Sequence, residues 1–512
     1  MVFGVMLLSK ALGFVSQVVV TGLIGTTGRA DAYYFALSLV TVVSALVFGS
    51  AGSVLIPLYV EKREREGAAA AGRFAGVVLT YLTLALVVLS LLLAAFARPL
   101  VAALGRFPAE VLPLAVRVFA FTAPLAVLIG VGQLLMAILQ ARKGFIAPAL
   151  MGVLHSVVFL GVVAAAWSRL GIYALVLGAT LSLAGQAAVM LWRLAKQETF
   201  SASLRWGPGE VHRLWLFAWP LLMSQMLSTT QLVASRKIAS GLLVGAVSAL
   251  AYAESLKAIF LDLCVAPVAQ VSLVLFSEKL ARGENDSAWE QLQQALAALW
   301  FLVTPVVVIL LVAAGPLVRL LYQRGAFTAE STALTASALT FFSLGLLGEG
   351  PYYLVSRYYL ANRESWILTC LGIPFTGLYV FLLYFLSKIM GIVGIALGHS
   401  LVMIVALVVA VLILRLRSRS RFDESFLRSL GKIAVSGLAM LLITRYGVSR
   451  FAAMLGSDFS SRLVMLLLVG GLGTVFYILM AVLLGTPRDV PLLGKFRPGA
   501  LLRQFSARYS AR

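Results

Sequence analysis

The run FAGVVLTYLTLALVVLSLLLAAFA, from Phe74 to Ala97, decides the class of fold, because it carries no charge over a length that crosses a bilayer. A membrane-spanning helix needs about 20 apolar residues. Two similar uncharged runs lie at Leu170 to Trp192 and Leu463 to Pro487. The 512-residue chain is 61% hydrophobic and 12% charged, unlike a soluble domain. We therefore predict an all-α polytopic membrane protein.

The apolar runs along the chain indicate about fourteen transmembrane helices. We expect no cleavable signal peptide, because the first apolar run is too long and no cleavage site follows it. With the N-terminus in the cytoplasm, about 26 of the 41 lysines and arginines fall in cytoplasmic loops, about 11 in outer loops and about 4 within spans. This bias predicts that both termini are cytoplasmic. It also explains most of the +21 net charge, so nucleic-acid binding is not expected.

Enzymatic chemistry has little support in this sequence. No connection between spans is long enough for a soluble domain, and the G-x-x-x-x-G-K-[ST] motif of ATPases is missing. His155, His212 and His399 lie far apart without ligand spacing, and Cys264 and Cys370 lie inside spans. We therefore predict a non-enzyme with no metal site, no disulfide and no cofactor.

An internal repeat divides the chain. At a constant offset of 217, DAYYFALSL from Asp31 aligns with SALAYAESL from Ser248, and SVLIPLYVEK aligns with QVSLVLFSEK. Two six-helix copies inserted the same way up are typical of transporters, with the substrate site between the halves. The predicted parts are an N-lobe at 1–200 (spans one to six), a C-lobe at 201–420 (spans seven to twelve), two extra spans at 421–487 and a basic cytoplasmic tail at 488–512.

Four further stretches carry a family resemblance. They are SKALGFVSQ (Ser9–Gln17), GRADAYYFA (Gly28–Ala36), LQARKGFIAPAL (Leu139–Leu150) and LYQRGAFTAESTALTASAL (Leu321–Leu339). Together with the entry to span eight, they resemble the MurJ/MviN flippases of the MOP superfamily of exporters, over nearly the whole chain.

The resemblance implies a flippase of the bacterial inner membrane that moves lipid II, an undecaprenyl-pyrophosphate-linked glycan, to the outer leaflet for peptidoglycan synthesis. Alternating access around a water-accessible cavity would serve that task. An exopolysaccharide or O-antigen precursor is the alternative cargo. A small-molecule antiporter and a non-transporting scaffold are further alternatives, although the basic residues expected in the cavity argue against the antiporter.

Ionisable residues inside spans are costly and usually face a cavity or a partner. Lys10 occupies the family's arginine position in span one, so we expect it to meet the pyrophosphate; its alternative is to snorkel to the interface. Gln17 lies two helical turns further on the same face. Asp31 matches an acidic residue of the family at the mouth of span two, and its alternative role is a helix N-cap.

Spans seven, eight and ten carry the second group of candidates. We expect Gln231, Arg236, Lys237, Glu254 and Lys257 to line the opposite cavity wall, with Asp262 deeper in span eight. The alternative for the i,i+3 residues Glu254 and Lys257 is a self-neutralised pair that only holds the helix. Glu349 lies between two glycines in span ten, which predicts a role in gating or in close helix packing.

Three positions depart from the resemblance. Ser16, Ser44 and Ser255 stand where the family has cavity arginines, and lysines elsewhere do not reproduce the bidentate grip of arginine on phosphate. This favours an altered cargo or a loss of activity.

The resemblance also bears on coupling and partners. The family's proposed sodium site uses Asp and Asn from spans seven and eleven; here span eleven has neither and span seven has no carboxylate, so sodium coupling is not favoured and membrane potential or another ion is the expected drive. We expect a monomer. The basic tail from Leu492 to Arg512 is predicted to lie on anionic lipids, or to be an ordinary positive-inside tail.

Overall fold

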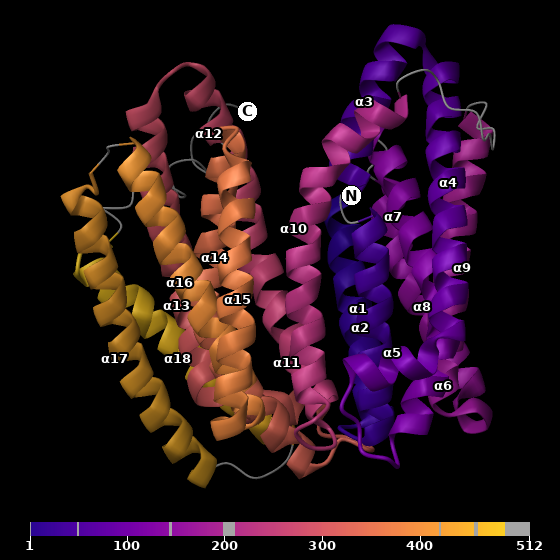
Figure 1. The fold of residues 1–512 in the computed structure, drawn as a ribbon. Helices are drawn as coiled ribbons and strands as arrows, with labels where there is room; N and C mark the ends of the chain where they lie inside the picture. Colours follow the sequence, from indigo (N-terminus) through magenta and orange to yellow (C-terminus); the bar gives the residue numbers. More distant parts are fainter. Residues whose placement is uncertain are drawn as a thin grey trace, which may run out of the picture. The chain divides into compact units, whose positions relative to one another are not determined.

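The computed structural model describes residues 2–48, 51–142, 146–197, 210–418, 421–454 and 459–486. Every regular element in this part of the chain is helical (Figure 1), which confirms the predicted all-α class. The basic tail at 488–512 lies outside the described residues, so its contact with anionic lipids stays a prediction.

The chain forms two compact units, and it crosses between them more than once. The first comprises Met1–Ala249 and Arg324–Ser331, and the second comprises Leu250–Gln323 and Thr332–Arg512. The helices of the first are α1 (Val2–Ile24), α2 (Gly28–Phe48), α3 (Ala51–Glu66), α4 (Ala68–Ala95), α5 (Ala97–Leu104), α6 (Leu112–Thr122), α7 (Leu125–Ala141), α8 (Ile146–Leu170), α9 (Ile172–Gln197) and α10 (Glu210–Ala239).

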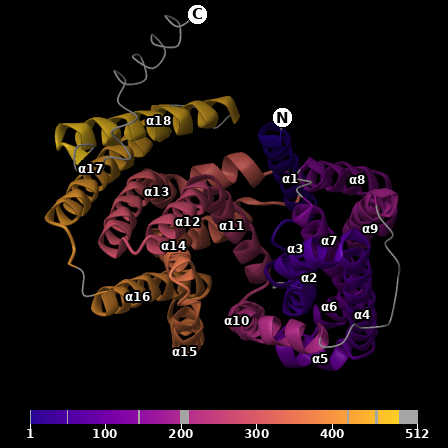
Figure 2. The ribbon, with the colours of Figure 1, turned by 90° about the horizontal axis from the view of Figure 1, so that it is seen from above.

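Helix α11 (Ala246–Phe260) begins in the first unit and continues into the second. The second unit also holds a π-helical turn (Leu261–Val265), α12 (Ala266–Ala281), α13 (Asn285–Tyr322), α14 (Ala329–Ala361), α15 (Ser365–Met390), α16 (Ile392–Ser418), α17 (Glu424–Met454) and α18 (Phe459–Leu483). Within it α15 and α16 lie side by side, and α17 and α18 pack against each other and against α13 (Figure 2).

Eleven helical segments of the described residues are long and apolar enough to cross a membrane, which makes the chain a multi-pass membrane protein. They correspond to predicted spans three to six and eight to fourteen, so the predicted count of fourteen is not confirmed. Predicted spans one, two and seven correspond to α1, α2 and α10. Within α1 the stretch Leu8–Ile24 is apolar but shorter than the segments counted.

Helix α10 packs against α2 and α3 and belongs to the first unit. The lobes predicted from the sequence place it instead in the second, since their boundary lies near residue 200. The predicted boundary near residue 200 rests on the internal sequence repeat, whereas the two units are defined by how compactly the chain folds. The division into lobes at 1–200 and 201–420, with 421–487 added, therefore stays a prediction.

Two long spans bend at prolines. The eighth span, Ala246–Ala281, contains the π-turn Leu261–Val265 just before Pro267. A proline lacks the N–H that continues a helix, and its ring clashes with the carbonyl four residues earlier. The wider π-turn absorbs this conflict. In α13, Ala313 leaves helical geometry (φ −117°, ψ 16°) shortly before Pro316 for the same reason.

The glycines around Glu349 let α14 approach its neighbours closely. A Cβ on Gly348 would lie 2.6 Å from the backbone of Met403 and Ile404 in α16. A Cβ on Gly350 would lie 2.9 Å from the side chain of Val265 in the π-turn. Close helix packing, one of the two roles expected for this stretch, is therefore what the glycines serve here.

We expect Gly348→Ala to lower the free energy of unfolding by about 1 to 3 kcal/mol, because the new methyl group meets backbone atoms that cannot rotate away. The matched control is Gly377→Ala in α15, where a Cβ meets nothing within 4 Å. That change should be neutral or stabilising by up to about 1 kcal/mol, the helix-propensity gain. Thermal unfolding of the two detergent-purified variants measures the difference. Equal stabilities would contradict the close approach.

Candidate translocation site

Asp31 is buried, and it holds the start of a different helix from its own. One carboxylate oxygen accepts a hydrogen bond from the Gly245 N–H at 2.6 Å. The other accepts from the Ser248 N–H at 2.8 Å and from the Ser248 hydroxyl at 2.7 Å. These are the free N–H groups at the beginning of α11, where a negative charge is favoured. Helix α2 is capped instead by Thr27, whose hydroxyl accepts from the Ala30 N–H at 3.3 Å.

Asp31 therefore caps α11, whereas the N-cap role predicted for it concerns its own helix, α2. The predicted internal repeat aligns Asp31 with Ser248, at the offset of 217. Asp31 thus ties the starts of the equivalent helices α2 and α11 together.

The LYQRGAF stretch folds onto the end of α1. The Ala326 N–H donates to the carbonyl oxygen of Gly22 at 2.7 Å, and the Thr26 hydroxyl donates to the Ser331 hydroxyl at 2.7 Å. Gly325 has a positive φ of 58°, which a residue with a side chain rarely adopts. The segment at 324–331 therefore belongs to the first unit, although α13 and α14 on either side of it belong mainly to the second.

Arg236 on α10 is buried beside α2. Its Nε donates to the Ser38 hydroxyl at 3.1 Å, and its positive charge acts on the carboxylate of Asp31. Gln17 on α1 donates through Nε2 to the Tyr34 hydroxyl on α2 at 3.2 Å. Three predicted site residues of the first unit therefore meet at helix α2. Asp31 belongs to this helix, and Gln17 and Arg236 donate hydrogen bonds to it.

The remaining predicted residues differ in their exposure. Lys10 is exposed on α1, Gln231 and Lys237 are half-buried on α10, and Glu254 is half-buried on α11. Asp262 is exposed within the π-turn. Contact with a substrate stays a prediction for all of them.

The three serines in place of family arginines have different environments. Ser44 is fully buried, and its hydroxyl donates to the carbonyl oxygens of Val40 and, across to α7, of Ala126. Ser255 is half-buried and bonds only within its own helix, to the carbonyl oxygen of Ala251 at 2.8 Å, as Ser16 does to that of Leu12. Ser44 is thus a packing position, Ser16 is also buried, and Ser255 alone of the three is half-buried.

We expect Ser44→Arg to prevent accumulation of folded protein, because it forces a guanidinium between α2 and α7 without a partner. Ser255→Arg should accumulate normally, since that side chain is not enclosed. Size-exclusion chromatography of fluorescently tagged variants after membrane extraction compares the two. Equal monodisperse peaks would show that the α2–α7 contact is not as closed as described.

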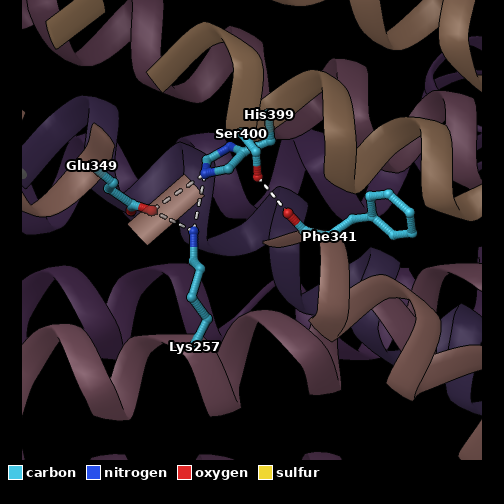
Figure 3. A network of polar contacts seen from close by, with 5 residues as sticks. All are labelled: Lys257, Phe341, Glu349, His399 and Ser400. Carbon is cyan, nitrogen blue, oxygen red and sulfur yellow. Dashed lines mark hydrogen bonds and ion pairs between the residues drawn. The ribbon is translucent and has the colours of Figure 1, made fainter. Parts of the chain in front are cut away.

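The second unit contains a triad of ionisable residues, Lys257 on α11, Glu349 on α14 and His399 on α16 (Figure 3). Lys257 Nζ lies 2.7 Å from Glu349 Oε2 and 3.0 Å from His399 Nε2. His399 Nε2 lies 3.4 Å from the same Glu349 oxygen. The side chains are 7%, 25% and 16% exposed for Lys257, Glu349 and His399.

This triad bears on two interpretations of the sequence. The alternative of a pair between Glu254 and Lys257 within one helix does not hold for Lys257, whose ion pair is with Glu349 on another helix. His399 has no ligand spacing in the sequence, so spacing does not mark it as a site residue. The signal that identifies it is its position within an apolar span, where an ionisable residue generally has a function.

The fold resembles those of solved multi-helical membrane proteins. A solved structure titled lipid II flippase MurJ, inward closed conformation, superposes with a TM-score of 0.77 at 21% identity, covering 96% of this chain and 99% of that one. A multidrug resistance MATE family transporter of the MOP superfamily, in an inward-facing conformation, gives a TM-score of 0.68 at 15% identity, covering 80% of this chain and 94% of that one.

Sequence comparison identifies the family more closely. The family model described as lipid II flippase MurJ matches residues 20–466, so the chain belongs to the MurJ family. A probable lipid II flippase MurJ of Rhizobium tropici is 27% identical over 363 residues, 67% of this chain and 66%, about two thirds, of that relative. One from Thermotoga maritima is 25% identical over 445 residues, 85% of this chain and 88% of the relative.

Proposed function

We propose that this chain is a flippase that moves lipid II from the inner to the outer leaflet of the bacterial inner membrane. The observation that carries the proposal is the match of the MurJ family model to residues 20–466. The relatives of that family are transporters, and no catalytic step is required. Following the distribution of basic residues, we assign both termini to the cytoplasm.

The geometry at Asp31 supports an alternating-access mechanism. Helices α2 and α11 start at loops that we assign to the outer side from the distribution of basic residues, and Asp31 joins them through three hydrogen bonds. Release of these bonds would free the start of α11 from α2 on that side. The role of Asp31 is thus to hold the starts of α2 and α11 together, rather than to bind the substrate.

Depletion with rescue tests the function. The resident lipid II flippase is shut off in a cell that has only one, this chain is expressed, and lipid II exposed to the periplasm is assayed. We expect rescue by the chain and loss of rescue by Lys10→Ala, since Lys10 is the basic residue assigned to the pyrophosphate. The control is Lys62→Ala, whose side chain pairs with Glu66 on α3. A chain that reaches the membrane and never rescues would contradict the assignment.

A second cargo has one specific observation in its favour. Ser255 stands where the resembling family has arginine, and it is half-buried, whereas Ser16 and Ser44 are buried. A site with fewer arginines suits a headgroup held less by its pyrophosphate, such as an undecaprenyl-linked exopolysaccharide or O-antigen precursor. Adding Ser255→Arg should then improve rescue if lipid II is the cargo, and leave it unchanged if it is not.

A further inference from the structure

We propose that Lys257, Glu349 and His399 form a proton-binding site that couples transport to the proton gradient. The inference rests on the proposed function, because a coupling site needs a transported substrate. It begins from the contacts of the triad, which bring an ammonium, a carboxylate and an imidazole from three helices within 3.4 Å of one another.

We assign the charges of the triad from these contacts. An ammonium group only donates hydrogen bonds, so His399 Nε2, 3.0 Å from Lys257 Nζ, is assigned as the acceptor. This assignment puts the ring proton on Nδ1 and makes the imidazole neutral. With a positive Lys257 and a negative Glu349, the triad as assigned is neutral.

One further proton changes this arrangement. A hydronium ion gives its proton to His399 Nε2 and leaves as water, so the bond from Lys257 to that nitrogen breaks. The new N–H can donate to Glu349 Oε2, now 3.4 Å away. The imidazolium and the ammonium repel each other at 3.0 Å, and the triad carries a net charge of +1. The two protonation states therefore differ in the contacts between α11 and α16.

The surroundings of the triad favour such a two-state response. The Phe342 ring on α14 lies under the Lys257 ammonium at 5.3 Å and edge-on to His399. The Tyr379 ring on α15 meets His399 edge-on at 6.0 Å, and its phenol is the titratable group that α15 presents there. Within the described residues, the other titratable groups in contact with His399 are Lys257 and Glu349.

Close packing transmits a change in the triad. Gly348 and Gly350, on either side of Glu349, lie against α16 and against Val265 of the π-turn. A π-turn is a weak point of a helix and is often found at functional sites. A shift of Lys257 away from His399 therefore moves the end of α11. That end adjoins the π-turn Leu261–Val265, where the eighth span is already irregular.

The charges give the direction of coupling. A net positive charge inside a membrane is stable only beside water or an anion. The protonated triad therefore belongs to the states in which water reaches Glu349, a quarter of whose side chain is exposed. Export of the anionic pyrophosphate and return of a proton both follow an inside-negative potential. We assign an exchange in which the proton enters as the lipid leaves.

The first test needs no substrate. His155 and His212 are replaced by Gln, which leaves His399 as the sole histidine, and the ring nitrogens are followed by ¹⁵N NMR in nanodiscs from pH 5 to pH 9. We expect a neutral Nδ1–H imidazole at high pH that gains a proton at Nε2. Lys257→Met should alter this titration, whereas Lys388→Met, a lysine on α15 outside the triad, should not. A single protonation state over the whole range, or no effect of Lys257→Met, would overturn the proposal.

The second test uses proteoliposomes with labelled lipid II and an ionophore that clamps the membrane potential. One proton exchanged per lipid predicts that a gradient of one pH unit shifts the leaflet ratio of lipid II by about tenfold. His399→Gln should remove that shift. His155→Gln, a matched histidine on α8, should keep it. Lipid II that equilibrates without responding to the gradient would overturn the coupling and leave flipping intact. Lipid II that never moves would overturn both.

Discussion

Asp31→Ala should lower the free energy of unfolding by about 4 kcal/mol and abolish transport. The change removes a buried carboxylate that accepts three hydrogen bonds and leaves the N–H groups of Gly245 and Ser248 without that acceptor. Each hydrogen bond to a charged group contributes roughly 1.5 to 3 kcal/mol, and such contributions are not additive within one cluster.

Asp31→Asn and Ser248→Ala serve as graded controls for this prediction. Asparagine keeps one oxygen acceptor, so it should lose about half as much stability. Ser248→Ala removes only a hydroxyl donor, so we expect a loss of about 1 kcal/mol. Denaturant unfolding of the purified proteins measures the stability losses of the three variants and so their order. If Asp31→Ala costs no more than Ser248→Ala, Asp31 does not hold α11.

Lys257→Met should lower the free energy of unfolding by about 3 kcal/mol, because it leaves the Glu349 carboxylate inside the membrane without its ammonium partner. Breaking a fully buried ion pair costs about 3 to 5 kcal/mol, and the low end applies because 25% of the Glu349 side chain is exposed. The control Lys388→Met removes a lysine that lies over the Tyr384 ring and should cost less than about 1 kcal/mol.

The double variant Lys257→Met with Glu349→Gln decides the cause of that loss. Removing both charges should recover at least half of the stability, since no unpaired charge is left. Thermal unfolding of the four proteins completes the cycle. If Glu349→Gln lowers stability further on top of Lys257→Met, the loss in the single variant does not come from an unpaired carboxylate.

The fold class could be predicted from single runs such as Phe74 to Ala97, because the length and apolarity of a span are local properties of the sequence. The number of spans depends on where each apolar run begins and ends, and eleven of the fourteen predicted spans have counterparts among the described helices.

The partners of the site residues were beyond sequence reasoning. Lys257 is separated from Glu349 by 92 positions and from His399 by 142, so no spacing rule connects them. The i,i+3 spacing in the sequence points instead to Glu254 as a partner of Lys257. Asp31 is different, because the repeat at offset 217 had already aligned it with Ser248. The alignment marked the two positions as equivalent, but only the three-dimensional structure shows that they touch.

Ser44 shows that alignment with a family does not reveal the surroundings of a side chain. Its alignment with a cavity arginine suggested a missing phosphate contact, yet the side chain is fully buried and bonded across to α7. A difference in residue type therefore does not by itself indicate a different substrate. Ser255, which is half-buried, is the position at which a change of cargo can be tested.

Lipid II movement by the purified chain is the most direct test of the flippase assignment. Proteoliposomes carry lipid II labelled on its headgroup, and an impermeant reagent destroys the label in the outer leaflet only. We expect the wild-type chain to expose the protected half of the label, while Asp31→Ala and protein-free vesicles keep it protected. Protection that stays complete with folded wild-type protein, while an undecaprenyl-linked polysaccharide precursor is exposed, would show that lipid II is not the cargo.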